Sequence, residues 1–188
     1  MADPTSFLFL LSMMLLLLQS YLFSFANAEI LNVTTDKSAL FELKAHISSK
    51  DSHHVLISNW SSNTHICTWV GVTCGSKHLR VKALNLSYMD LNEFSGALPE
   101  IGNLTMLRAL FLYENNFEGT IPSSLLKCTQ LQYLDMWNNN FTGRLSPEIG
   151  NLTMLTYLYL AQNKFEASTG RQKLKGTIQR LSPVRARV

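Results

Sequence analysis

Apolar residues recur at a fixed interval in the second half of the chain. Three segments begin at Leu107, Leu131 and Leu155, each 24 residues after the last, and read LRALFLYENNFEGTIP, LQYLDMWNNNFTGRLS and LTYLYLAQNKFEAS. In each segment the order apolar, any residue, apolar predicts a short strand with its apolar side chains facing inward, because successive side chains of a strand alternate in direction. A fixed interval predicts similar structural units that stack on one another.

The spacing within each segment follows L-x-x-L-x-L-x-x-N, the pattern of leucine-rich repeats. The expected inward pairs are Leu84/Leu86, Leu110/Leu112, Leu134/Met136 and Leu158/Leu160. Asn115, Asn139 and Asn163 follow at matching positions. A buried amide must find hydrogen-bond partners, so we expect these asparagines to form a structural ladder through the stack.

The first and last repeats depart from the pattern. Met89 stands in place of the asparagine in the repeat that starts at Val81, and Asn92-Glu93-Phe94 has the form of a three-residue insertion. After Glu166 the expected Gly-x-Ile-Pro is missing. We therefore predict about three and a half repeats over residues 81–165 and an irregular tail over 166–188.

The N-terminus has the composition of a secretory signal. An apolar run extends from Phe7 to Phe25, and Ala26-Asn27-Ala28 gives a small-x-small cleavage pattern. We expect a signal peptide over residues 1–28, although the segment before the run carries Asp3 and no Lys or Arg. The alternative is an uncleaved membrane anchor, because the run approaches the length that spans a bilayer.

Residues 29–80 predict a cap over the first repeat. Asp36 is the expected N-cap of a helix whose apolar stripe includes Ala39, Leu40, Leu43 and Ile47. Cys67 and Cys74 enclose six residues and predict a disulfide in an oxidising compartment. A metal site that adds His65 and His78 is the alternative.

The distribution of charge and the third cysteine change this interpretation little. Residues 1–166 hold 13 acidic and 10 basic residues, for a net −3, whereas the last 22 residues hold six basic residues and no acid. We interpret this tail as a solvated end, since nucleic acid is an improbable partner behind a secretory signal. Cys128 is expected to be a buried apolar residue, with pairing between chains as the alternative.

The outward positions of the predicted strands form a candidate binding surface. They would place six aromatic residues and one carboxylate on a concave face four strands wide: Phe111, Tyr113, Tyr133, Asp135, Trp137, Tyr157 and Tyr159. Large aromatic residues beside a charge are typical of binding hot spots. The alternative is that some of these rings only cover the sheet.

Six Asn-x-Ser/Thr sequons predict N-glycosylation of a secreted chain. They begin at Asn32, Asn59, Asn85, Asn103, Asn140 and Asn151. Asn103 and Asn151 lie in matching GNLT segments and are the strongest candidates, whereas a glycan at Asn85 would cover the concave face.

Three segments resemble the ectodomains of plant leucine-rich-repeat receptor-like kinases: DKSALFELKAHI, NWSSNTHICTWVGVTC and GTIPSSLLKCTQLQYL. The turns at 95–99 and 119–122 fit the plant-specific repeat class. The resemblance implies an α/β repeat solenoid, a right-handed superhelix with a short parallel sheet on its concave face and a helical N-terminal cap. It also implies binding of a peptide or protein ligand, or of a co-receptor ectodomain.

The kinase part of that family is not legible in this sequence. There is no Gly-rich ATP loop, no V-A-I-K-like lysine and no H-R-D segment. We expect neither catalytic residues nor a cofactor or metal, and we expect no transmembrane helix after the signal peptide. We therefore expect this chain to be a truncated product of a longer receptor gene.

The leading interpretation is an extracellular recognition module in defence or development signalling. It would be secreted to the apoplast, or held at the cell surface if the N-terminal segment is an anchor or the native product is longer. The alternatives are a secreted inhibitor of a microbial cell-wall hydrolase and a non-functional gene product.

Overall fold

The computed structural model describes residues 4–47, 59–87 and 94–166. It divides into two compact units, Met1–Thr34 and Thr35–Val188. The first unit consists of helix α1 (Pro4–His46) up to Thr34. The side chains of residues 11–21 are all exposed, so this apolar part of the helix buries nothing within its own unit. In the part of the chain that the structure describes, no helix has the length and apolar character needed to cross a membrane.

The last turns of α1 form the helical part of the predicted cap. Ala39, Leu40 and Leu43 are buried, as the apolar stripe predicts. The prediction that Asp36 caps the helix N-terminus is wrong, because α1 begins at Pro4 and continues through this position. Asp36 is fully buried and its carboxylate binds Arg80 instead.

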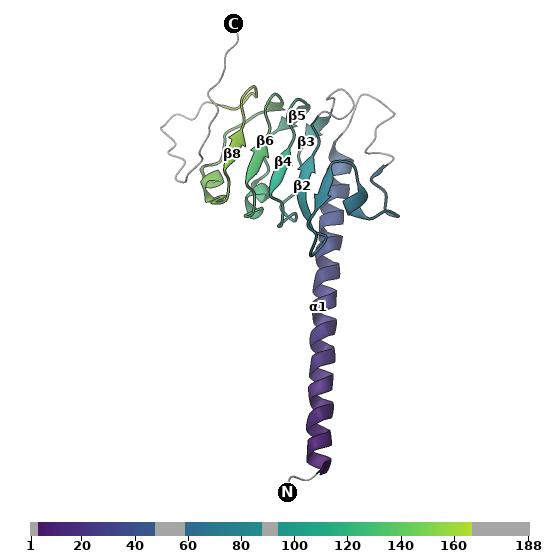
Figure 1. Cartoon of the computed structure of the whole chain (residues 1–188). Helices are drawn as coiled ribbons and strands as arrows, with labels where there is room; N and C mark the ends of the chain where they lie inside the picture. Colours follow the sequence, from purple (N-terminus) through teal and green to yellow (C-terminus); the bar gives the residue numbers. More distant parts are fainter. Residues whose placement is uncertain (1–3, 48–58, 88–93, 167–188) are drawn as a thin grey trace. The chain divides into compact units, whose positions relative to one another are not determined.

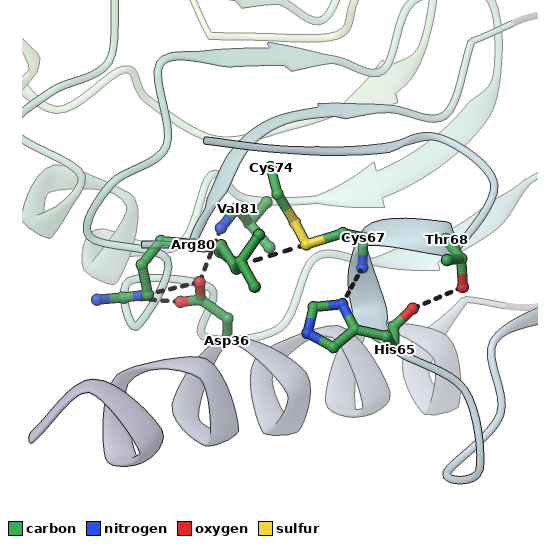
Figure 2. The surroundings of a disulfide bond; sticks show 8 residues. Asp36, His65, Cys67, Thr68, Cys74, Arg80 and Val81 are labelled. Carbon is green, nitrogen blue, oxygen red and sulfur yellow. Dashed lines mark hydrogen bonds and ion pairs between the residues drawn. A yellow bond between two sulfur atoms is a disulfide. The ribbon is translucent and has the colours of Figure 1, made fainter. Parts of the chain in front are cut away.

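The predicted disulfide is confirmed in the cap (Figure 2). Cys67 and Cys74 are joined with their Cα atoms 5.5 Å apart. The bridge links the short 3₁₀ helix η1 (Ile66–Thr68) to strand β1 (Val72–Cys74). Nearby, the Trp60 and Trp69 rings stack at 5.3 Å and both are buried. The cap therefore has its own aromatic core in addition to the bridge.

The main sheet has five strands in the order β1-β2-β4-β6-β8. Strand β1 pairs antiparallel with β2, and all the other pairs are parallel. The parallel strands are β2 (Val81–Asn85), β4 (Ala109–Phe111), β6 (Tyr133–Asp135) and β8 (Tyr157–Tyr159), which lie side by side in sequence order (Figure 1). The predicted sheet was four strands wide; β1 of the cap adds a fifth and covers the edge of the first repeat.

The predicted inward pairs form the core. Seven of the eight side chains are buried, and Leu160 in the last repeat is half-buried. Two further short helices close the turns between strands: η2 (Ser123–Lys127) and η3 (Pro147–Asn151). Leu125 and Ile149 on these helices are buried and belong to the core.

The asparagine ladder is present as predicted. The Asn139 amide donates to the carbonyl oxygen of Leu112 in the preceding repeat at 2.8 Å, and its Oδ1 accepts from the backbone N–H of Phe117 at 3.0 Å. Asn163 repeats this arrangement with Met136 and Phe141. Each asparagine therefore joins two repeats.

A second sheet was not predicted. Strands β3 (Ser95–Ala97), β5 (Asn116–Gly119) and β7 (Asn140–Phe141) pair in parallel in that order. Beside it runs a ladder of stacked rings, with centroids 6.2–6.3 Å apart, formed by Phe94, Phe117, Phe141 and Phe165. Gly96 of β3 approaches the end of α1 so closely that a Cβ would lie 2.5 Å from the His46 carbonyl oxygen.

The phenylalanine ladder corrects the predicted insertion. Phe94 occupies the same place as Phe117 and Phe141, and its N–H donates to Asn115 Oδ1 as theirs do to Asn139 and Asn163. Phe94 is thus a regular repeat position, and the extra residues precede it. Met89, Asn92 and Glu93 lie outside the described residues, as does the basic tail beyond Glu166.

Candidate functional site

The outward positions of the main sheet line up in the predicted columns. One register row joins Ala83, Ala109, Tyr133 and Tyr157, and the next joins Asn85, Phe111, Asp135 and Tyr159. Because parallel strands lie about 4.8 Å apart, neighbouring side chains of a row can touch. The sheet therefore brings the predicted aromatic residues of β4, β6 and β8 to one face.

The aromatic residues of this face are partly open to solvent. Tyr133 is 40% exposed, and Phe111, Tyr113, Trp137, Tyr157 and Tyr159 are half-buried. The Tyr133 and Tyr157 rings stack at 4.7 Å with an angle of 11° between their planes. Stacked rings cover each other's faces and leave their edges outward, so this pair presents a rigid wall rather than a flat platform.

Asp135 lies at the middle of the aromatic face. Its register neighbours are Phe111 on β4 and Tyr159 on β8. Its Oδ1 accepts a hydrogen bond from the backbone N–H of Trp137 at 3.0 Å. Burial raises the pKa of this carboxyl above its ordinary value, and the Trp137 hydrogen bond offsets part of that effect.

The β2 end of the same face is small and polar. Asn85 is exposed, and its Oδ1 accepts from the Ser87 N–H at 3.0 Å and also from the Ser87 hydroxyl. Ser87 itself is 5% exposed. The aromatic surface thus begins at β4, and the first repeat contributes little to it.

A polar hollow beside the second sheet was missed by the sequence analysis. Its volume is about 430 Å³, and its lining is Ser95, Asn115, Asn116, Glu118, Asn138, Asn139 and Asn140. Two of these residues belong to the structural ladder. The runs Asn115-Asn116 and Asn138-Asn139-Asn140 are the only signal in the sequence that could have indicated it.

The sequons differ in their surroundings. Asn103 and Asn151 are exposed, whereas Asn59 and Asn140 are half-buried. The Asn59 side-chain oxygen accepts from the Val70 N–H and is therefore already engaged. Asn85 is exposed on the candidate binding face, and the Asn32 side chain lies outside the described residues.

The remaining candidate chemistry has structural roles. His65 Nδ1 accepts from the Cys67 N–H at 3.2 Å and caps η1 (Figure 2). Cys128 is buried, as predicted, and burial followed by the Asp36 charge raises the pKa of its thiol to about 12. Across the described residues there is no group of three or more His, Cys, Asp or Glu side chains that could hold a metal ion.

Comparison with protein families assigns both parts of the second unit. The model described as "Leucine rich repeat N-terminal domain" matches residues 33–75. The "Leucine Rich Repeat" model matches residues 106–128 and 130–152. The LRR receptor-like serine/threonine-protein kinase EFR of Arabidopsis thaliana is 40% identical over 128 residues, which are 68% of this chain and 12% of that protein. The chain thus spans about an eighth of the length of this relative.

Solved structures agree with the fold. The PEPR1–AtPEP1 complex superposes with a TM-score of 0.63 at 34% identity, covering 69% of this chain and 18% of that one. The BIR3–SERK2 complex of Arabidopsis thaliana gives a TM-score of 0.59 at 30% identity and covers 68% of each chain. The matched residues correspond to the leucine-rich-repeat ectodomain of these relatives. The chain belongs to the plant leucine-rich-repeat receptor kinase family, and it comprises the cap and first repeats of such an ectodomain.

Proposed function

We propose that this chain is an extracellular recognition module that binds a peptide or protein ligand, or a co-receptor ectodomain, on its main sheet. The observation that carries the proposal is the alignment of Asp135 and four aromatic residues on three adjacent strands, with Tyr113 and Trp137 two residues beyond the ends of β4 and β6. Aromatic residues that remain partly open beside a carboxylate offer contact area at a small entropic cost. We assign no catalytic step to the module.

Two of the similar solved structures are complexes, which supports the same interpretation. The PEPR1 structure is a complex with AtPEP1, and the BIR3 structure is a complex with SERK2. These partners are those of the relatives. For the present chain they indicate the class of partner to test, namely secreted peptides and other repeat ectodomains.

The test uses two aromatic residues of the face. The full chain and its Trp137→Ala/Tyr159→Ala variant are immobilised and exposed to a panel of purified plant secreted peptides and receptor ectodomains. We expect the wild type to retain at least one member and the variant to lose it. Met154→Ala is the matched control, because Met154 is 46% exposed and lies outside the sheet. Equal capture by wild type and double variant would refute the proposal.

We further propose secretion to the apoplast with cleavage after Ala28, and glycan attachment at Asn103 and Asn151. Both asparagines are exposed and lie outside the strands of the main sheet, Asn103 in a turn and Asn151 at the end of η3. Secreted protein should begin at Glu29 by N-terminal sequencing. Glycosidase treatment should lower its mass, and Asn103→Gln/Asn151→Gln should remove most of that change. An N-terminus at Met1, or an unchanged mass, would contradict these assignments.

A further inference from the structure

We infer that the main sheet recognises a peptide through one cationic side chain, an arginine or a lysine, that pairs with Asp135. The inference rests on the proposed function and specifies the chemistry of its ligand.

The position of Asp135 in the register favours a single anchoring point. Phe111 and Tyr159 flank it on the neighbouring strands. Tyr133 precedes it by two residues in β6 and shares its face of the sheet by the alternation of a strand, and Trp137, two residues beyond it, donates its backbone N–H to the carboxylate. Four aromatic residues thus surround one carboxylate.

The carboxylate is only partly satisfied. Its Oδ1 accepts from the Trp137 N–H. Within the described residues, no hydrogen bond and no ion pair engages its second oxygen. Burial already disfavours the charged form of this group, which is visible as its raised pKa. A cation placed here would offset that cost, whereas an anion would add to it.

The surrounding rings favour a cation as well. The face of an aromatic ring attracts a guanidinium or ammonium group, and arginine also stacks on such faces. A neutral donor could also bond the second carboxylate oxygen, but a charged donor makes the stronger hydrogen bond. The stacked Tyr133–Tyr157 pair forms one wall of the site, so the rings of Phe111, Trp137 and Tyr159 are the ones available to contact the bound side chain.

A matched peptide series tests the inference. Six-residue peptides of alanine, serine and tyrosine carry one variable position that holds arginine, lysine, citrulline or glutamate. Citrulline retains the shape of arginine without its charge. Binding to the full chain is compared among the wild type, Asp135→Asn and Glu118→Gln. The amide oxygen introduced by Asp135→Asn can still accept from the Trp137 N–H, and Glu118 is an exposed carboxylate on β5 of the second sheet.

We expect the wild type to prefer arginine or lysine to citrulline by about tenfold, the usual effect of a charge-assisted hydrogen bond. Asp135→Asn should reduce this ratio to about one, and Glu118→Gln should leave it unchanged. A wild type without the preference, or a preference retained in Asp135→Asn, would overturn the inference. Peptides that bind without a charge preference, but only when Trp137 and Tyr159 are intact, would overturn this inference and leave the proposed function standing.

Discussion

The Asp36 carboxylate receives two hydrogen bonds from the Arg80 guanidinium, at 2.8 and 2.7 Å, and a third from the Val81 N–H at 2.9 Å. Both side chains are buried, and they lie 44 residues apart in the sequence. The pair therefore ties the cap helix to strand β2, the first strand of the repeats (Figure 2).

Removing one member of the Asp36–Arg80 pair should lower the stability of the protein considerably. Arg80→Met leaves a buried carboxylate without its cation, and we expect the free energy of unfolding to fall by about 3–5 kcal/mol. Urea denaturation measures the change. The control is Arg144→Gln, which breaks the exposed pair with Glu166 and should cost less than about 1 kcal/mol. If Arg80→Met lowers the free energy of unfolding by as little as Arg144→Gln does, the buried pair contributes little to stability.

The asparagine ladder allows a second prediction. Asn139→Ala removes the amide that donates to Leu112 and leaves the Phe117 N–H without its acceptor. We expect a loss of about 2–3 kcal/mol by urea denaturation, because partly buried backbone groups lose their partners. Asn116→Ala, at an exposed position of β5, should change stability by less than about 0.5 kcal/mol. A ladder residue that behaves like Asn116 would contradict the structural role.

Backbone strain at one position predicts a substitution that stabilises the protein. Glu114, Asn138 and Gln162 share a positive φ of 54°, 52° and 55° at matching places in three repeats. Asparagine adopts this left-handed conformation more readily than glutamate. Glu114→Asn should therefore raise the free energy of unfolding by about 0.5–1 kcal/mol, read as a higher melting temperature. Glu118→Asn, at a position without positive φ, should give no increase.

The raised pKa of Asp135 predicts a pH dependence. Below the ordinary value of 3.8 the group is protonated in both folded and unfolded chains. As the pH rises through the interval between 3.8 and the folded-state pKa, only the unfolded chain ionises, so stability falls. Asp135→Asn lacks this loss. Its free energy of unfolding should match that of the wild type near pH 3 and exceed it at about pH 7; a difference that shrinks with rising pH would contradict the assignment.

The Cys128 thiol should be unreactive in the folded chain. Its pKa of about 12 leaves almost no thiolate at neutral pH, and burial blocks access. We expect labelling by iodoacetamide at about pH 8 only when urea unfolds the protein. Rapid labelling of one thiol in the native state would show that the site opens.

The features that repeat along the chain could be predicted from the sequence. The inward leucines, the asparagine ladder and the outward aromatic positions each follow from the 24-residue interval and the alternation of a strand. The phenylalanine ladder has the same interval, at Phe117, Phe141 and Phe165. It could have been predicted in the same way, but it was overlooked.

Features that depend on tertiary contact could not be predicted. The identity of the Asp36 partner is one, because local sequence favours an N-cap and the real partner is 44 residues away. The second sheet is another, because Ser95–Ala97 has no apolar alternation that would mark it as a strand. The hydrogen bonding of the Asp135 carboxylate could not be predicted either, because it depends on which groups the fold brings next to it.

The asparagines that bond to two repeats affect how this molecule unfolds. Asn115, Asn139 and Asn163 each bond to their own repeat and to the one before it, so no repeat can open without breaking a bond in its neighbour. In a linear array, strong coupling between neighbours makes the whole array melt in one step. Forces applied at one end would likewise be distributed across all the repeats that these asparagines join.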